Sequence, residues 1–404
     1  MPTSRDPRLE TAVGESVDLS TGGPGRGVAL APCSHRPPCT ACPRYGNPGI
    51  APMAAAALAQ LARAHGLADV PLVSGPVAAF RLRARLAIRG RMGSPKIGLF
   101  EEGTHRVVHV PNCRVHHPLI NRVAQTVRQA LVDARVPIYS ETAHLGVARY
   151  LQVAIERRSH SAQVVLVANS ATAEPLAQAL TLIRERLGDE LHSLWFNAQC
   201  GRGNAVLGPQ FERIAGAESV VECFGGADVH YPPGAFGQSN LEVAGELIAE
   251  LRRQVPRDSR VAEFYAGVGA IGLSLIEQVQ ELRLNEASPQ SLQGLQMGIA
   301  GLGELVRSKA KVIPGPAATS VDAADGADVV IVDPPRKGLD EPLTRHLAAQ
   351  PPPRLLYVSC ELGSLLRDAS LLLESGRLRL AALTAFNLMP YTLHVETLAR
   401  FERS

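Results

Sequence analysis

The sequence predicts an α/β fold in which an α+β region precedes a C-terminal, doubly wound sheet. From Arg260 onward, apolar strand patterns alternate with helical patterns, as in open sheets with helices on both faces. Two apolar runs, 329–333 and 355–360, read as buried strands that stop abruptly at polar residues. A Gly-rich turn follows the strand that begins at Val261 and opens a helix. These three observations define the fold class.

Length and composition fit an ordinary globular protein with two or three domains. The chain has 404 residues, 46% of them hydrophobic and 20% charged. Aromatic residues make up only 4%, which argues against broad base-stacking platforms. No apolar run approaches the roughly 18 residues of a membrane span, and the N-terminus lacks the apolar core of a signal peptide. We therefore expect a cytoplasmic protein with no membrane association.

Composition divides the chain into three parts. Residues 1–30 are rich in Gly, Pro, Ser and Thr and predict a flexible leader. Residues 31–235 predict an α+β domain with a cysteine-rich loop at its start. Its helix at about 50–66 is also a candidate for packing on the catalytic domain. Residues 236–404 predict the doubly wound domain.

A cluster of cysteines opens the second part. Three thiols lie within ten residues, at Cys33, Cys39 and Cys42. Seven cysteines, an odd count, argue against a disulfide framework and favour metal binding or catalysis. Cys113 is the candidate for a fourth ligand, because Cys200 and Cys223 lie in apolar contexts. All-thiolate ligation suits an iron–sulfur cluster or zinc, and the spacing leaves both open.

The α+β part carries one charged pattern. Residues 80–91 alternate with period two, so that Arg81, Arg83 and Arg85 share one strand face. Such a face suits a phosphate backbone, and a merely solvated outer face is the alternative. Further strands are expected at 96–100, 104–110, 148–156, 162–168 and 193–199, and helices at 50–65, 174–187 and 241–254. Ser239 or Asn240 is expected to cap the last of these helices.

The chemistry is expected at the ends of the C-terminal strands. Cys360 ends one buried strand where a helix begins, which is where open α/β sheets bind ligands. A buried structural cysteine is the alternative. Asp333 lies in a Pro-stiffened loop, and Glu286, at the end of the second strand, could accept hydrogen bonds from a ribose. The Gly-rich turn 267–272 suits a nucleotide-like cofactor but does not distinguish dinucleotides from methyl donors.

Six stretches together resemble the RNA 5-methyluridine (uracil-C5) methyltransferase family, which are S-adenosylmethionine-dependent enzymes with a Rossmann-like class I domain. They occur in the family's order and spacing, and the match continues from about residue 33 to the C-terminus. The stretches are Phe236-Gly-Gln238-Ser-Asn240, Phe264-Tyr-Ala-Gly-Val-Gly269, Asn285-Glu286, Asp333-Pro-Pro-Arg-Lys-Gly338, Ser359-Cys360 and Pro390-Tyr-Thr-Leu-His394-Val-Glu396-Thr.

The resemblance implies a role for each matching residue. Cys360 would add to carbon 6 of uracil, and a base would then remove the proton from carbon 5. Strand spacing allows His394 or Glu396 as that base, and the family pattern chooses Glu396. The residues implied to hold S-adenosylmethionine are Gln238, Tyr265, Glu286 and Asp333.

The resemblance also implies a cluster and a substrate. Cys33, Cys39, Cys42 and Cys113 correspond to the ligands of the [4Fe–4S] cluster in the family's 23S ribosomal RNA branch, with zinc as the alternative. The expected partner is therefore RNA, with 23S rRNA favoured by the cluster, bound by a monomer and by the α+β domain. The target base would be flipped out or unpaired. The N-terminal TRAM barrel of many relatives is expected to be absent.

Two alternative functions stay open: a tRNA 5-methyluridine methyltransferase and an inactive iron–sulfur RNA-binding protein. Pro335 stands where 5-methylcytidine enzymes usually carry a second cysteine, and Arg336 replaces the stacking aromatic of amino-group methylases. Two departures from the family pattern are Ala270, where Asn is common, and Glu361-Leu362 after the expected nucleophile.

Overall fold

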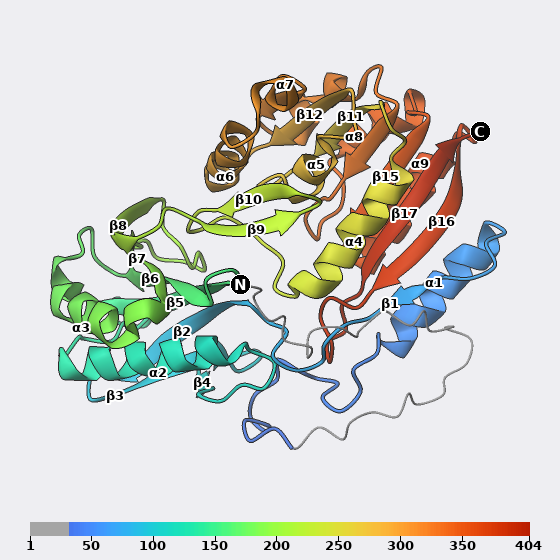
Figure 1. The fold of residues 1–404 in the computed structure, drawn as a ribbon. Coiled ribbons are helices and arrows are strands. Elements are labelled where there is room, and N and C mark those ends of the chain that lie inside the picture. Colours follow the sequence, from blue (N-terminus) through green and yellow to red (C-terminus); the bar gives the residue numbers. More distant parts are fainter. Residues whose placement is uncertain (1–31) are drawn as a thin grey trace, which may run out of the picture.

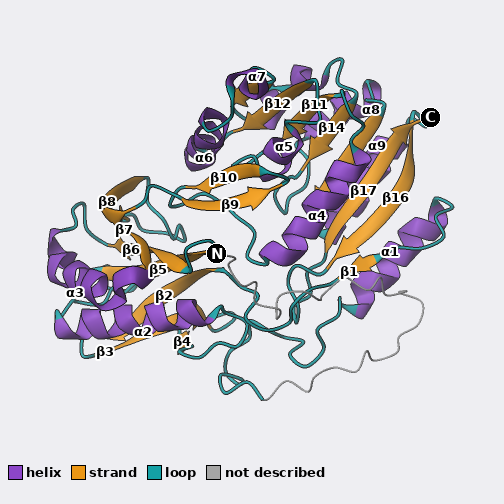
Figure 2. Cartoon of the chain, viewed as in Figure 1, coloured by secondary structure: helices purple, strands orange, loops and turns teal. Residues whose placement is uncertain are grey.

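The computed structural model describes residues 32–404, so the predicted leader 1–30 lies outside the described residues. The described chain forms an eight-stranded sheet, a seven-stranded sheet and a separate two-stranded hairpin (Figure 1). Helices accompany both large sheets (Figure 2). Within this range no helix is both long and apolar enough to cross a lipid bilayer.

The eight-stranded sheet contains the predicted C-terminal strands and confirms the α/β class. The five strands β11 to β15 are parallel to one another, whereas β17 lies antiparallel between β15 and β16. Its spatial order is β1 (Leu72–Val73), β16 (Leu378–Phe386), β17 (Glu396–Arg403), β15 (Arg354–Ser359), β14 (Val329–Val332), β11 (Arg260–Phe264), β12 (Glu281–Glu286) and β13 (Ala310–Pro314).

Strand alternation divides this sheet's side chains between two helical layers. Val329 and Ile331 of β14 join the core that includes one set of helices, and Val330 and Val332 join the other core. The first layer contains α4 (Leu241–Gln254), α5 (Ala270–Leu275) and α6 (Pro289–Ala300). The second contains α1 (Pro52–Ala64), α8 (Glu341–Ala349) and α9 (Leu362–Leu373). In Figure 2, α4 lies in front of β15 and β17.

The seven-stranded sheet belongs to the N-terminal region. Its order is β4 (Val107–His109), β3 (Ser94–Phe100), β2 (Arg83–Arg91), β5 (Ala148–Glu156), β6 (Ser161–Ala168), β7 (Leu191–Ala198) and β8 (Gln210–Gly216). Only the β6–β7 pair is parallel. Helices α2 (Pro118–Asp133) and α3 (Ala177–Leu187) share its larger core. The strands expected here are confirmed, whereas α2 was not among the predicted helices.

Two N-terminal elements lie against the C-terminal sheet. β1 pairs in parallel with β16, and α1 packs on the same strand (Figure 1). The hairpin of β9 (Val220–Phe224) and β10 (Ala227–Tyr231) packs on α5 and α6. The remaining helices are short: α7 (Glu304–Arg307), η1 (Glu174–Leu176), η2 (Gly188–Glu190), η3 (Ala317–Thr319) and η4 (Val321–Ala324). Elements of the N-terminal region therefore pack directly on the C-terminal sheet and on its helices.

The arginine face of β2 differs from the prediction. The alternation is present, because Leu82, Ala84 and Leu86 are buried. However, the Arg83 guanidinium lies over the Tyr231 ring, 4.0 Å from its centroid, and is not free for a phosphate. Arg85 is exposed and donates to the Gln152 side chain. The residues therefore do not form one continuous exposed ridge.

Candidate functional site

Three predicted residues meet at the carboxyl edge of the eight-stranded sheet. Asp333 follows β14, Cys360 follows β15, and Glu396 is the first residue of β17. Ser359 pairs with Thr397, so one further step of that register sets Cys360 opposite Glu396. The topology thus brings a thiol and two carboxyls to one edge, where open sheets bind ligands.

Helix α9 holds the Pro-rich loop that follows β14. The Ser364 hydroxyl donates to the Arg336 carbonyl at 2.6 Å, and the Asp368 carboxylate accepts from the Leu339 backbone at 2.8 Å. Gly338 has φ +82°, and a Cβ there would lie 2.4 Å from the Asp368 carboxylate. Glycine is required at this position, and the loop is tied to the helix that begins just beyond Cys360.

The site is crowded with acidic groups. Burial raises the pKa of the Glu396 carboxyl, and the neighbouring Asp333 raises it further. Burial likewise raises the pKa of Asp333. The Cys360 thiol has its pKa raised to about 11, first by burial and then by Glu396 and Asp333, while Arg336 acts in the opposite direction. These carboxyl groups favour a positively charged group among them.

The predicted cofactor residues lie around the Gly-rich turn. The Glu286 carboxylate accepts from the Gly267 backbone at 2.7 Å, which fixes this acid beside the turn. The Tyr265 hydroxyl donates to the Asp340 carboxylate at 3.2 Å, so it also braces the Pro-rich loop. Gln238 is half-buried just before Asn240, which caps α4 as expected by accepting from the Val243 backbone.

Sequence reasoning missed three residues near this edge. Glu263, in β11, is 2% exposed, and burial, Asp333 and Glu286 raise the pKa of its carboxyl. Phe236 is 66% exposed, which is unusual for a large aromatic side chain. A lone acid near the end of an apolar strand, and an aromatic in a loop beside Gln238, were the available signals.

Arg336 is the third missed residue. The Arg336 guanidinium lies 3.1 Å from the Nε2 atom of His394. Burial and this arginine lower the pKa of His394. The contact gives His394 a cationic partner, whereas Glu396 is the group opposite Cys360. The placement therefore favours Glu396 over His394 as a base.

The four N-terminal cysteines line one separate cavity of about 150 Å³, which also receives Arg81 and His116. These cysteines are Cys33, Cys39, Cys42 and Cys113. Two further cysteines, Cys200 and Cys223, are exposed and line no part of this cavity.

The donor set of this cavity fits a metal centre by its chemistry. Four half-buried thiols that face one cavity are suitable ligands for an iron–sulfur cluster or zinc. As they stand, no three His, Cys, Asp or Glu side chains within residues 32–404 converge as ligands of a metal ion. The structure therefore shows the thiols gathered around one space, with ligand geometry left as a prediction.

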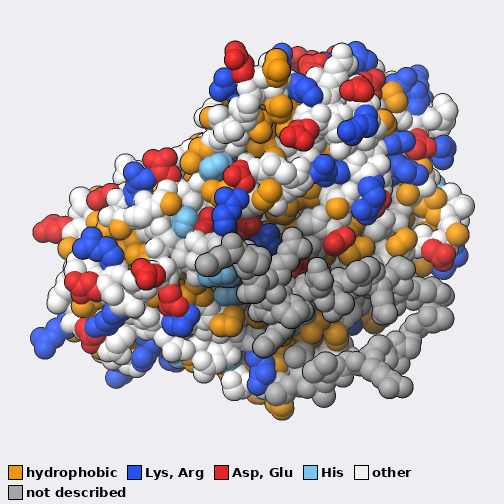
Figure 3. All heavy atoms as spheres, in the orientation of Figure 1, with side chains coloured by type: hydrophobic (Ala, Val, Ile, Leu, Met, Phe, Trp, Pro, Cys, Tyr) orange, Lys and Arg blue, Asp and Glu red, His pale blue; other side chains and the backbone are white. Residues whose placement is uncertain are grey.

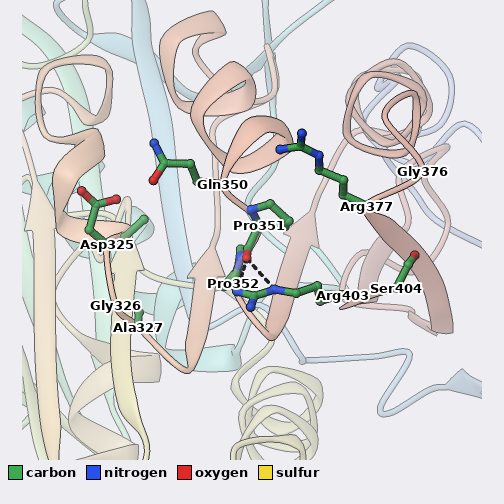
Figure 4. A pocket seen from close by; sticks show the side chains of 11 residues that line it. Asp325, Gly326, Ala327, Gln350, Pro351, Pro352, Gly376, Arg377, Arg403 and Ser404 are labelled. Carbon is green, nitrogen blue, oxygen red and sulfur yellow. Dashed lines mark hydrogen bonds between the residues drawn. The ribbon is translucent and has the colours of Figure 1, made fainter.

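A larger cavity, of about 550 Å³, lies at the opposite edge of the eight-stranded sheet (Figure 4). Its lining includes residues just before β14 and β15, with Arg377 and Arg403. The Arg403 guanidinium is already bonded to the Pro351 carbonyl, at 3.0 Å from Nε. Because ligands of open sheets bind at the carboxyl ends of the strands, this cavity is the poorer candidate.

Comparison with known proteins gives a consistent picture. The sequence model described as tRNA (uracil-5-)-methyltransferase matches residues 323–403. An uncharacterized RNA methyltransferase from Protochlamydia amoebophila is 32% identical over 338 residues, covering 82% of this chain and 88% of the relative. A second uncharacterized RNA methyltransferase, from Halalkalibacterium halodurans, is 27% identical over 326 residues and covers 79% and 69%.

A solved structure resembles the fold over most of its length. The crystal structure of Pyrococcus abyssi tRNA (uracil-54, C5)-methyltransferase in complex with S-adenosyl-L-homocysteine superposes with a TM-score of 0.69. It covers 85% of this chain and 81% of that one at 20% sequence identity. The likeness supports the Rossmann-like arrangement of the eight-stranded sheet.

Proposed function

The chain belongs to the RNA uracil-5-methyltransferase family of enzymes, and from that premise we propose that it methylates carbon 5 of a uridine in 23S rRNA, with S-adenosylmethionine as donor. The observation that carries this proposal is the juxtaposition of Cys360 and Glu396 at the carboxyl edge of the sheet. A nucleophile and a base side by side are the minimum for this reaction.

The charge of the site supports a cationic methyl donor. Glu263, Asp333 and Glu396 have carboxyl groups whose pKa values are raised, and Glu286 lies beside them at the Gly-rich turn. Part of the pKa shift of Glu263 and Glu396 comes from neighbouring carboxyl groups, a repulsion that a bound sulfonium would relieve and the pyrophosphate of a dinucleotide would increase. When bound, S-adenosylmethionine supplies an electrophilic methyl group. Gln238, Tyr265, Glu286 and Asp333 would hold it.

The protein's own groups carry the remaining chemistry. The Cys360 thiolate adds to carbon 6 of the uracil and forms a C–S bond, so that carbon 5 becomes nucleophilic and takes the methyl group. The Glu396 carboxylate then removes the proton from carbon 5. The C–S bond breaks, its electron pair returns to sulfur, and 5-methyluridine leaves. Arg336 favours the thiolate because it opposes the rise in the pKa of Cys360.

The base must leave its stack to reach Cys360. Phe236, exposed next to Gly237 and Gln238, offers a ring on which such a base could stack. On the face seen in Figure 3, basic and acidic side chains are interspersed, in keeping with a net charge of +3. We therefore propose that local contacts, more than a large basic field, position the RNA.

The four-cysteine cavity supports a [4Fe–4S] cluster as the second cofactor. The thiols supply the ligands, and Arg81 beside them offsets negative charge. Zinc is the alternative. The cluster is the reason to favour 23S rRNA over tRNA as substrate.

We further propose that residues 31–235 bind RNA and residues 236–404 carry out catalysis, in a cytoplasmic monomer. The packing of α1 on β16 places part of the first region against the second.

The deciding experiment maps 5-methyluridine by mass spectrometry. Ribosomal and transfer RNA from a deletion strain are compared with wild-type RNA, and each is then treated with purified protein and S-adenosylmethionine. We expect one 23S rRNA uridine to lose its methyl group in the deletion strain and to regain it in vitro. A loss confined to tRNA would assign the alternative substrate. Failure to bind S-adenosylmethionine would point to an inactive RNA-binding protein.

A further inference from the structure

The cysteine loop, defined as residues 33–50, is fastened to the loop that leads into Glu396. This second segment, residues 387–395, joins β16 to β17 and is called the β16–β17 loop. The Arg44 backbone N–H donates to the Tyr391 carbonyl at 2.9 Å. The Asn387 side chain donates to the Pro48 carbonyl at 2.6 Å. Two hydrogen bonds thus join segments from the two ends of the described chain.

Aromatic packing strengthens this junction. The Tyr391 side chain is fully buried, and its ring centroid lies 5.2 Å from that of Tyr45 at an interplanar angle of 40°. Phe80 and Val115 pack in the same cluster. Aromatic pairs at this distance stabilise their contact beyond the area that they bury. The cysteine loop therefore covers a ring that would otherwise be exposed on that side.

The backbone of the β16–β17 loop depends on such support. Tyr391 has φ +69°, in the left-handed region that bulky residues rarely adopt. A bulky residue held in this region is strained and persists there only when its surroundings fix it. Arg81, which lies just before β2, adds a further contact to this loop, because its Nη2 atom lies 3.4 Å from the Met389 sulfur.

The other end of this loop carries the proposed base. Only residues 392–395 separate Tyr391 from Glu396. Glu396, the first residue of β17, pairs with Phe386, the last residue of β16, so this pair joins the two ends of the β16–β17 loop. The next residue, Thr397, pairs with Ser359 just before Cys360. Because this connection is short, a displacement of Tyr391 would move Glu396 more than Cys360, which lies on another strand.

We propose that the cysteine loop positions the general base, because it clamps Tyr391 and so holds Glu396 beside Cys360. The inference rests on the proposed roles of those two residues. Loosening the clamp should slow removal of the carbon-5 proton more than formation of the C–S bond. In that step the proton passes to the Glu396 carboxylate, and the C–S electron pair returns to sulfur. The methylated RNA–protein adduct would then accumulate.

The test separates the two steps by choice of substrate. RNA that carries 5-fluorouridine has no carbon-5 proton, so its covalent trapping reports C–S bond formation and methyl transfer without the base. Turnover of ordinary uridine RNA requires proton removal as well. Both rates are measured for full-length protein at equal metal content per chain, with covalent adduct followed by denaturing gel and intact mass.

The variants are Tyr391→Ala and Tyr45→Ala, the second on a half-buried residue in case the first fails to fold. We expect trapping to stay within about threefold of wild type, turnover to fall about tenfold or more, and adduct to accumulate on uridine RNA. Tyr391→Phe is the matched control. The Tyr391 hydroxyl is buried and finds no hydrogen-bond partner among the described residues, so Phe should restore turnover.

Other outcomes overturn the inference in distinguishable ways. Equal losses of trapping and turnover would mean that the junction acts through RNA binding or general folding. Unchanged turnover in Tyr45→Ala and Tyr391→Ala would mean that no clamp exists. Glu396→Gln should itself accumulate adduct, and if it does not, the base assignment fails. A wild-type protein that forms no trap overturns the proposed function.

Discussion

Two sites in this protein contain half-buried thiols whose surroundings differ. At the carboxyl edge of the eight-stranded sheet, burial raises the pKa of Cys360 to about 11, and the carboxyl groups of Glu396 and Asp333 add to it. In the cysteine cavity, burial raises the pKa of Cys42 to about 11, and the next causes are other thiols, while Arg81 opposes them. The raised pKa alone does not distinguish the sites.

The neighbours of each thiol indicate which ligand it accepts. Carboxyl groups around a single thiol favour a cationic group and leave one sulfur free to attack a substrate. Several thiols together, with Arg81 and His116 beside them, favour a metal centre whose thiolate ligands make it anionic. The same residue type is thus proposed as a nucleophile in one place and as a ligand in the other.

The largest expected effect would come from removing the single thiol. Cys360→Ala should abolish the covalent adduct with 5-fluorouridine RNA and lower turnover by about 10⁴-fold or more, because no other group can add to carbon 6. Binding of S-adenosylmethionine should be retained, as measured by calorimetry. Cys223→Ala, at an exposed thiol, is the control and should trap normally. An adduct that persists in Cys360→Ala would assign the nucleophile elsewhere.

The sequence was sufficient to predict that Asp333 and Cys360 follow buried strands at the carboxyl edge of the sheet. Runs of apolar residues that stop at Asp333 and Cys360 mark strand ends, and parallel strands bring their carboxyl ends together. Asn240 was also a sound prediction, since an N-cap is a local feature. Local signals of this kind depend only on residues adjacent in the chain.

Features that depend on distant partners were not predictable. The insertion of β17 between β15 and β16 is a pairing of non-consecutive strands, which periodicity does not encode. The period of β2 gave the correct face for Arg83 but not the Tyr231 ring that covers it. Likewise, the acid cluster around Glu263 arises only when β11 and β14 lie side by side. Tertiary contacts decided each case.

The second prediction concerns the cysteine cavity. Cys113→Ala should remove most of the bound iron and sulfide, because the cavity would lose one of four thiols and the one outside the 33–42 segment. The free energy of unfolding should fall by roughly several kcal/mol as metal binding is lost. Metal and sulfide analysis and chemical denaturation measure both effects. Cys200→Ala is the matched control. Zinc without sulfide in the wild type would contradict a cluster.

The third prediction uses pH at the carboxyl edge of the eight-stranded sheet. The pKa of Glu396 is raised to about 8 in the folded protein from an ordinary value near 4.5. Between these values the folded state binds more protons than the unfolded state, so stability falls as pH rises. Glu396→Gln removes this pH-dependent loss of stability, because glutamine does not titrate. It should raise the free energy of unfolding by an amount that grows from about pH 4.5 to 8, reaching on the order of a few kcal/mol.

Urea denaturation at several pH values measures this difference. Glu374→Gln, at an exposed site, should show no such growth with pH. A constant difference between Glu396→Gln and wild type across the range would show that the carboxyl is not buried as an acid. The comparison between the two thiol sites would then lose its electrostatic basis.

The smallest expected effect is on thiol reactivity and concerns Arg336, a cation that opposes the effect of the acids on Cys360. Arg336 lowers the pKa of that thiol, so Arg336→Gln should reduce the thiolate fraction and slow alkylation by iodoacetamide roughly threefold to tenfold. Because the Arg336 side chain is exposed, salt should screen its charge and narrow the difference between variant and wild type. Arg377→Gln, at the opposite edge of the sheet, controls for net charge. A rate that is unchanged in Arg336→Gln would leave burial and the carboxyl groups as the only controls on the thiol.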